Sequence, residues 1–195
     1  MKRIGILSDT HSCWDTRYET HFKDCDEIWH AGDIGDMSIV RRLQEIAPVV
    51  RAVSGNIDGG EVRRACREVE TFEVEGVRVH LRHIGGYPGK YAPGVEQSLI
   101  YGKTGLMVCG HSHILKVMYD SRRGLLHINP GVAGTHGWQQ VRTLVKLTID
   151  GGEMRDLEVI ELGKRKIKLN DFLDNYYEID YEGNLLEERV RRNGF

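Results

Sequence analysis

Short apolar runs alternate with polar stretches of helical periodicity over the first two-thirds of the chain. The β-branched runs that are typical of buried strands lie at residues 3–7, 27–31 and 49–53. Helices are predicted between them at residues 14–23 and 37–46, and Pro48 follows the second helix, where the periodic pattern stops. This order of elements predicts an α/β half.

The rest of the pattern is mostly extended. Strands are predicted at residues 77–82, 106–109, 115–119, 125–129, 141–149 and 154–162, with one helix at residues 94–101. Gly76 and the sequence Asp150-Gly151-Gly152 are typical of hairpin turns. An α/β half followed by a mostly antiparallel half indicates two sheets packed face to face, with helices on the outside.

The end of the chain has a different character. Residues 163–195 are charged and rich in tyrosine, without a clear period before a short helix predicted at residues 185–192. We therefore expect one domain over residues 1–162 and a C-terminal extension over residues 163–195. The extension is a surface segment, an oligomer contact or partly disordered, and its sequence leaves these alternatives open.

The charge balance is close to neutral, with 27 Lys+Arg against 29 Asp+Glu and a net charge of −2 over 195 residues. No global field therefore points to nucleic acid. A phosphate ligand would need a local source of positive charge, and a bound metal is the obvious one.

Targeting and redox features are few. No apolar run reaches the roughly 18 residues of a membrane span. The apolar start of the chain continues directly into Asp9 and His11, unlike a secretory signal peptide. The four cysteines form no C-x-x-C pair, so reduced thiols in a cytoplasmic protein are expected.

Five short polar motifs each fall just beyond the end of a predicted strand. They carry carboxylate, imidazole or amide groups, which are hard or borderline metal ligands. The motifs are Asp9-Thr10-His11, Gly32-Asp33, Gly55-Asn56, His83 and Gly110-His111-Ser112-His113. Because ligands of α/β sheets bind outside the carboxyl ends of the strands, these separate segments are expected to converge.

Spacing within the motifs favours a metal site. Asp9 and His11 stand two residues apart, as do His111 and His113, which projects both side chains of a pair to one side. A glycine before a ligand permits a sharp turn or a close backbone approach. Seven ligand groups exceed a tetrahedral zinc site and suit two cations that share a carboxylate. Each motif alone could be a turn, a cap or a core histidine, but their joint occurrence favours the metal site.

The motif order resembles that of the calcineurin-like metallophosphoesterases, specifically the small YfcE-like phosphodiesterases. That pattern runs D-x-H, G-D, G-N, H and G-H-x-H, and all five parts are present here. The sequence Asn129-Pro130-Gly131 also resembles a loop of the small members, and the resemblance covers roughly residues 1–162. It implies a four-layer α-β-β-α sandwich with two mixed sheets and flanking helices.

The resemblance also implies how the ligands are shared. One cation would take Asp9, His11, Asp33 and His113, and the second would take Asp33, Asn56, His83 and His111. Asp33 would bridge, and Asp33 and Asn56 would belong to the catalytic centre. A metal-bound hydroxide would attack a small phosphate ester, and diesters are expected rather than monoesters. Manganese is the expected metal, and iron, zinc and nickel fit the same ligands.

Two departures from the family pattern bear on the mechanism. Many relatives carry a histidine directly after G-N, whereas Ile57 stands there in this chain. Asp58 is the candidate that could protonate the leaving group in its place. His83 is followed by a Gly- and Pro-rich stretch that is either an ordinary surface loop or a loop over the site whose Lys90 or Tyr91 contacts a substrate.

The other histidines are assigned more simply. His30 is interpreted either as a residue behind the ligands that fixes a carboxylate or as a core histidine. His80, His127 and His136 are interpreted as structural or surface residues, with His136 as the main exception because its loop follows the Asn-Pro-Gly turn.

Two other functions compete with the phosphodiesterase. Some proteins of this fold have lost metal ligands and serve as interaction scaffolds, as one retromer subunit does. Here every ligand position is filled, which favours the enzyme. A nuclease is disfavoured because the chain lacks a basic groove interleaved with aromatic residues. We expect a small phosphate-ester substrate, no membrane and no nucleic acid as partners, with a homodimer as a further option.

Overall fold

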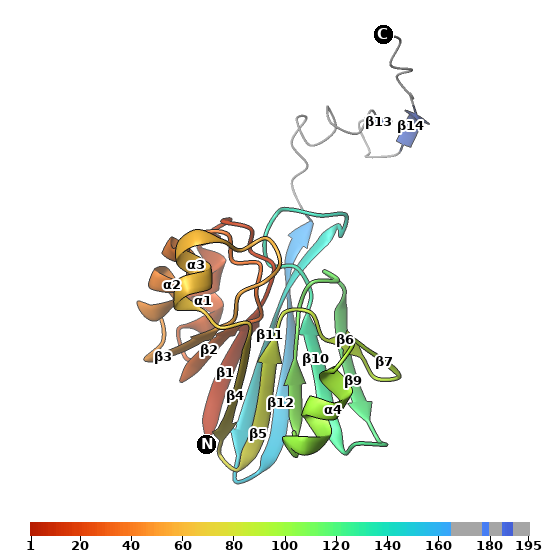
Figure 1. Ribbon diagram of the computed structural model, residues 1–195. Helices are drawn as coiled ribbons and strands as arrows, with labels where there is room; N and C mark the ends of the chain where they lie inside the picture. The colour runs from red at the N-terminus through yellow and green to blue at the C-terminus, as the bar shows by residue number, and fades with distance from the viewer. Residues whose placement is uncertain (165–176, 180–184, 189–195) are drawn as a thin grey trace. The chain divides into compact units, whose positions relative to one another are not determined.

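The computed structural model describes residues 1–164, 177–179 and 185–188 (Figure 1). Residues Met1–Arg165 form one compact unit and Lys166–Phe195 a second one. In the second unit, β13 (Tyr177–Ile179) pairs antiparallel with β14 (Leu185–Glu188). The helix predicted at residues 185–192 is therefore wrong over its first four residues, because strand pairing overrides a weak local helix preference. Its remainder, like most of the C-terminal extension, lies outside the described residues.

The first sheet has β1 at its centre. Its order is β12-β11-β1-β2-β3. The parallel strands are β1 (Lys2–Leu7), β2 (Glu27–His30) and β3 (Val49–Ala52). On the other side of β1, β11 (Val141–Asp150) and β12 (Glu153–Lys164) run antiparallel as a long hairpin. The predicted turn at Gly151-Gly152 joins this hairpin, with both glycines at positive φ.

The second sheet has a parallel centre and antiparallel edges, in the order β4-β5-β8-β10-β9. Its parallel strands are β5 (Val77–Arg82), β8 (Leu106–Val108) and β10 (Leu125–Pro130). The edge strands are β4 (Val69–Val74) and β9 (Leu115–Asp120). Both sheets are therefore mixed, as predicted.

Helices cover the outer faces of the two sheets (Figure 1). The first sheet is covered by α1 (Arg17–Phe22), α2 (Met37–Gln44) and α3 (Gly60–Ala65), whose buried residues share one core with Leu7 and Ile28. The second sheet is covered by α4 (Val95–Tyr101), which packs on Met107 and Leu125. The four-layer α-β-β-α sandwich is thereby confirmed. None of the helices within residues 1–164 has the length and apolar character needed to cross a bilayer.

The main core lies between the sheets. Residues from the inner faces of both sheets form one buried apolar cluster, which includes Ile4 and Ile6 of β1 and Val79 and Leu81 of β5. Trp29 of β2 is fully buried, and its ring meets that of Phe72 edge-on at a centroid distance of 5.1 Å. These contacts hold the two sheets in one orientation, so that loops from both can meet at a common edge.

Several elements differ from the sequence prediction. The first helix begins at Arg17 rather than at residue 14, and α3 was not predicted. That helix has six residues and buries only Val62, so it leaves no apolar period to recognise. The short hairpin of β6 (Gly86–Tyr87) and β7 (Lys90–Tyr91) was also not predicted, because two-residue strands show no alternation.

Arg142 of β11 ties the first sheet to the segment after β10. Its side chain is buried and donates hydrogen bonds to the Ala133 carbonyl and to Asp15 Oδ2, both at 2.8 Å. We predict that Arg142→Met lowers the free energy of unfolding by about 3 kcal/mol, because the partners lose buried bonds. Arg155→Met, which breaks the exposed pair of Arg155 with Asp150, should change it by less than about 1 kcal/mol. Urea denaturation measures both, and equal losses would contradict the prediction.

Candidate metal centre

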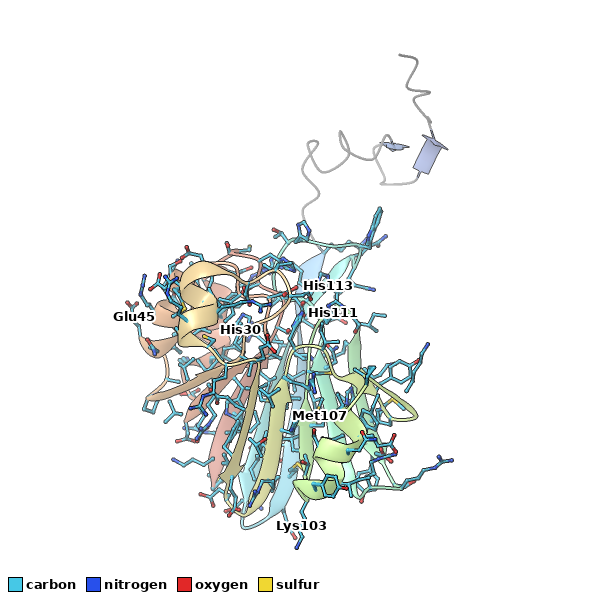
Figure 2. The ribbon with its side chains drawn as sticks, in the orientation of Figure 1. His30, Glu45, Lys103, Met107, His111 and His113 are labelled. Atoms are coloured by element: carbon cyan, nitrogen blue, oxygen red, sulfur yellow. The ribbon has the colours of Figure 1, made fainter. Side chains whose placement is uncertain are left out.

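The loops at the carboxyl ends of five strands meet at one edge of the sandwich. Figure 2 shows His111 and His113 close to this edge, at the far end of the sheets from Lys103. The loops follow β1, β2, β3, β5 and β8. They carry the seven predicted ligands: Asp9, His11, Asp33, Asn56, His83, His111 and His113. The structure brings all seven side chains together, in two groups.

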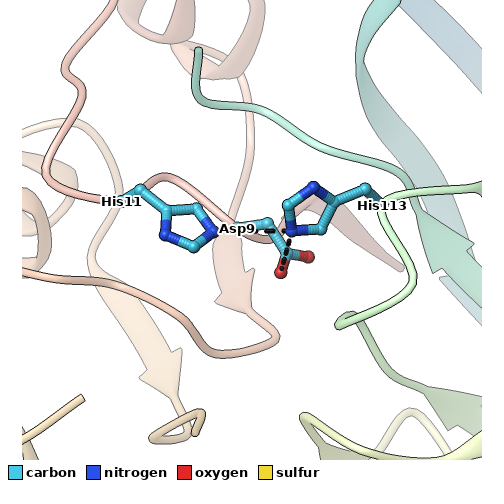
Figure 3. Close-up of side chains that lie close together, drawn as sticks. All are labelled: Asp9, His11 and His113. Carbon is cyan, nitrogen blue, oxygen red and sulfur yellow. Dashed lines mark hydrogen bonds and ion pairs between the residues drawn. The ribbon is translucent and has the colours of Figure 1, made fainter. Parts of the chain in front are cut away.

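The first group consists of Asp9, His11 and His113, whose ligand atoms all lie within 4.8 Å of one another. His113 Nε2 lies 3.2 Å from Asp9 Oδ1 and 3.4 Å from His11 Nε2 (Figure 3). Two imidazole nitrogens and a carboxylate oxygen thus point at one small space. Nitrogen and oxygen atoms in this arrangement suit a divalent transition metal.

The second group consists of Asp33, His83 and His111, again with ligand atoms within 4.8 Å of one another. His83 Nε2 lies 3.2 Å from Asp33 Oδ1 and 3.1 Å from Asn56 Oδ1. The amide of Asn56 therefore joins this group, as the sequence predicts. His111 is exposed, so this group has an open side toward solvent.

Asp33 lies between the two groups. Its Oδ1 faces His83 Nε2, whereas its Oδ2 lies 3.8 Å from His11 Nε2. Burial raises the pKa of the Asp33 carboxyl, but the hydrogen bond and charge of His83 outweigh this and hold its pKa below the ordinary value. One carboxylate oxygen is thus directed at each group, which is the geometry of a bridging ligand.

His83 is oriented by the backbone behind it. Its Nδ1 lies 2.8 Å from the Ala31 carbonyl oxygen, to which it donates, and its Nε2 faces Asp33 and Asn56. Metal-binding histidines are commonly fixed by such a bond to a backbone carbonyl. The side chain is thus held in a rotamer that turns Nε2 toward Asp33 and Asn56.

Asp9 provides a direct test of whether these residues fit a cation. Its side chain is fully buried, and Oδ1 makes no hydrogen bond within the described residues; the ring nitrogens of His113 and His83 lie 3.2 Å and 4.0 Å from it. A buried carboxylate oxygen without a hydrogen bond is costly unless a cation neutralises it. The donor set and this oxygen both fit a divalent metal.

The backbone at the ligands is strained. Nine residues other than glycine have a positive φ among those described, and five of them are predicted ligands: Asp9, His11, Asp33, His111 and His113. L-residues in this left-handed region are uncommon, and such strain, of order 1–3 kcal/mol for each residue, collects at functional sites. The loops are therefore shaped for the ligand geometry at the expense of local stability.

Two glycines show why small residues precede the ligands. A Cβ on Gly55 would lie 2.0 Å from Asp33 Oδ1, and one on Gly110 would lie 1.9 Å from Ser8 Oγ. The Cβ on Gly55 would also lie 2.3 Å from the Asp33 backbone nitrogen, so that clash could not be relieved without moving the loop of Asp33. The close backbone approach inferred from the sequence is present at both positions.

Comparison with known proteins agrees with this geometry. The sequence profile of the calcineurin-like phosphoesterase superfamily domain matches residues 1–152. The chain belongs to this superfamily. The family prediction is thereby confirmed.

Individual calcineurin-like relatives support the assignment. A probable metallophosphoesterase of Methanothermobacter thermautotrophicus is 33% identical over 174 residues, which are 82% of this chain and 92% of the relative. Vps29 of Chaetomium thermophilum has a TM-score of 0.68 at 13% identity and covers 95% of this chain and 92% of its own. A novel archaeal phosphodiesterase has a TM-score of 0.61 at 21% identity, over 81% and 99% of the two chains. At these identities the two solved structures show the fold alone.

His30 lies behind the ligand loops of this phosphoesterase domain and is fully buried. Its Nε2 lies 2.9 Å from the Thr10 hydroxyl, and its Nδ1 accepts a hydrogen bond from the Gly32 N–H at 3.2 Å. Burial lowers the pKa of His30 to about 4, so the neutral ring links the β1 and β2 loops. Both ring nitrogens are used by groups other than a carboxylate, which favours the core histidine of the two interpretations given above.

Asp58 has its two carboxylate oxygens occupied by backbone donors. Oδ1 accepts a hydrogen bond from the Gly35 N–H at 2.7 Å, and Oδ2 accepts bonds from the N–H groups of Ile34 at 3.1 Å and Gly55 at 2.7 Å. The residue is 3% exposed. Asp58 thus joins the loop of Asp33 to the loop of Asn56. This geometry favours a positioning role over the predicted role as leaving-group acid.

Two contacts in the phosphoesterase site were not predicted. The Asn129 side-chain amide donates to the Gly110 carbonyl at 2.8 Å and to Ser112 Oγ at 3.1 Å, which fixes the loop of His111 and His113. The His136 ring lies against that of His11 at a centroid distance of 4.7 Å. Asn129 lies near the carboxyl end of β10 and His136 follows that strand. The Asn-Pro-Gly sequence was the signal for this place in the chain, and it is the reason why His136 was named as the main exception above.

The loop after His83 carries the two residues, Lys90 and Tyr91, that the sequence offered as substrate contacts. The Tyr91 hydroxyl donates to Asp120 Oδ2 at 2.9 Å, and its side chain packs against the core below α4. Lys90 is exposed on the β6–β7 hairpin. Tyr91 is therefore committed to the fold, and a substrate contact for Lys90 stays a prediction.

The buried charge of Asp9 gives a test of the metal centre. We predict that Asp9→Asn leaves the metal-free protein as stable as the parent or up to about 2 kcal/mol more stable, because a buried charge is removed. Added manganese should raise the Tm of the parent more than that of the variant, since metal binding to the native state stabilises it. Calorimetry with and without manganese measures both effects.

Asp156→Asn is the matched control, because Asp156 also has a positive φ of 52° but is exposed on β12. Its manganese-dependent shift should equal that of the parent. A fall in the Tm of metal-free Asp9→Asn would instead show that the carboxylate stabilises the fold itself.

Proposed function

We propose that this chain is a phosphodiesterase that hydrolyses small phosphate esters with two divalent cations. The observation that carries the proposal is the position of Asp33, with one carboxylate oxygen toward each ligand group. Two cations that share a carboxylate are the arrangement used by two-metal phosphatases and nucleases. The similarity to a probable metallophosphoesterase supports the same reaction class.

The ligands divide between two cations as the groups suggest. Asp9, His11, Asp33 and His113 would hold one, and Asp33, Asn56, His83 and His111 the other. Cations bound there would activate a water and neutralise charge on the phosphoryl oxygens. Manganese is the metal that we propose first, and iron, zinc and nickel are the alternatives.

Backbone N–H groups orient the carboxylates of the proposed centre. The N–H of Ile57 donates to Asp33 Oδ1 at 3.1 Å, and the N–H of His111 donates to Asp9 Oδ2 at 3.2 Å, so two backbone bonds orient the two carboxylates. His136 is exposed and is not among the proposed ligands, which leaves its imidazole accessible to phosphate oxygens from solvent. We therefore assign substrate contact to His136 and the holding of the cations to the seven ligands.

The first test joins metal content to turnover. Elemental analysis of the purified protein should give about two transition metals per chain, and manganese-supplemented protein should hydrolyse bis-p-nitrophenyl phosphate. Asp33→Ala should lose at least about a hundredfold in kcat/KM together with bound metal, because it removes an oxygen from both groups. Asp156→Asn should retain both properties. A protein without metal or turnover after reconstitution would favour the interaction scaffold.

The second test concerns Asp58. Asp58→Asn places an amide donor among three backbone donors, so we expect a loss of about 1–3 kcal/mol in stability. Because the change displaces both ligand loops, kcat/KM should fall by the same factor for bis-p-nitrophenyl phosphate and for diphenyl phosphate, whose leaving group is poorer. A far larger loss on diphenyl phosphate would restore the role of leaving-group acid.

A further inference from the structure

Exposed apolar side chains stand directly beside the ligands. Ile57 follows Asn56, Ile84 follows His83, and Ile114 follows His113; the three are 47%, 41% and 48% exposed. Large aliphatic residues in such positions leave apolar surface in water around a polar site. A substrate made only of phosphate and small polar groups would not use that surface.

The loop between β10 and β11 covers the first ligand group. The Gly134 N–H donates to the Asp9 carbonyl at 3.1 Å, which anchors the loop to the residues after β1. The His136 ring lies against His11 at 4.7 Å. A Cβ on Gly137 would lie 2.2 Å from His113 Nδ1, so the loop backbone there touches the ring of a ligand. Two successive residues of the loop thus contact two ligands of one cation.

Trp138 follows Gly137 directly and is 78% exposed. Consecutive Cα atoms lie about 3.8 Å apart, so the indole is attached next to the residue that touches His113. Within residues 1–164, the indole makes no hydrogen bond and no ring contact, whereas Trp14 stacks with Arg42 and Trp29 is buried. Among the residues that the structure describes, a large aromatic surface is therefore exposed one residue away from the backbone that touches His113.

We propose that this site takes a phosphodiester whose non-leaving group carries a flat aromatic ring system of nucleobase size, which stacks on Trp138. The proposal rests on the proposed phosphodiesterase function and adds a substrate class to it. An indole can stack on any of the nucleobases, because every base has a π-face. The exposed isoleucines around the ligands would contact the remaining apolar edges of such a group.

The near-neutral charge balance of the sequence favours a mononucleotide-sized substrate. The chain carries a net charge of −2. Its composition therefore does not provide the excess of Lys and Arg that would bind many phosphates along a nucleic-acid strand. Binding would come from one stacked ring and one metal-bound phosphate. A nucleotide diester and the end of a nucleic-acid strand share this chemistry, and the experiment below separates them.

The test compares two diesters with the same leaving group. In thymidine 5′-(p-nitrophenyl) phosphate and methyl p-nitrophenyl phosphate, hydrolysis breaks the P–O bond to nitrophenol, water supplies the new oxygen, and thymidine or methyl stays on the phosphate. Trp138→Ala should lower the ratio of the two kcat/KM values, thymidine over methyl, by about tenfold to a hundredfold. Trp138→Phe should restore most of the ratio, since it keeps an aromatic ring.

Tyr101→Ala is the matched control. Tyr101 is 86% exposed at the end of α4, two residues before Lys103, which Figure 2 shows at the opposite end of the sandwich from His113. This variant removes an equally exposed aromatic ring far from the metal centre. Its ratio should equal that of the parent, and a drop as large as that of Trp138→Ala would overturn the proposal.

A binding measurement separates this inference from the proposed function. Thymidine 5′-phosphate should quench the tryptophan fluorescence of the manganese-supplemented protein, methyl phosphate should not, and Trp138→Phe should lose the quenching. Quenching without any turnover would support the aromatic subsite and reject the phosphodiesterase. Turnover with an unchanged ratio and no quenching would reject the subsite alone.

A competition arm identifies the source of the aromatic group. Single-stranded oligothymidylate that inhibits no better per strand than thymidine 5′-phosphate would assign the subsite to free nucleotide esters. Stronger inhibition that weakens steeply with added salt would assign it to the end of a nucleic-acid strand, since phosphate contacts release counterions. Inhibition by neither compound would contradict stacking on Trp138.

Discussion

The candidate metal centre depends on the alignment of the two sheets at one edge of the sandwich. β1, β2 and β3 of the first sheet and β5 and β8 of the second all end there, and the ligands are the residues that follow these ends. The buried cluster between the sheets, with Trp29 against Phe72, keeps the two edges in register. A tilt of one sheet against the other would separate His83 and the two histidines after β8 from the carboxylates after β1 and β2. The apolar core is thus what sets the distances among polar groups.

Hydrogen bonds then restrain the loops that the two sheets bring together. Asp58 joins the loops after β2 and β3, His30 joins the loops after β1 and β2, and Asn129 holds the loop after β8. None of these three residues belongs to the ligand groups. Together they restrain a set of loops whose backbone is strained at five ligands. Such a site exchanges local stability for a geometry that exists before any metal is bound.

The sequence predicted which seven side chains meet at this edge, but it did not predict the hydrogen bonds by which Asp58, His30 and Asn129 restrain the loops around them. Asp9, Asp33 and His83 follow apolar β-branched runs, so their location at strand ends is a local property of the chain. The partners of Asp58 lie 23 and 24 residues away at Gly35 and Ile34, and only the tertiary structure brings them together. α3 escaped prediction because it buries a single residue, and β14 because pairing overrode local preference. Hydrogen bonds between residues far apart in the chain produce no periodic pattern from which they could be predicted.

The pairing of β1 with β11 also determines when the site can exist during biosynthesis. Lys2 lies opposite Ile149 and Ile6 opposite Val145, so the central strand of the first sheet gains one neighbour only after nearly all of the domain has been made. At a synthesis rate of about 5–20 residues per second, the nascent N-terminal strand waits seconds for that neighbour. Asp9 and His11 directly follow this strand. The emerging chain therefore carries Asp9 and His11 before the sheet that organises them is complete, so the candidate ligand groups can form only in the finished fold.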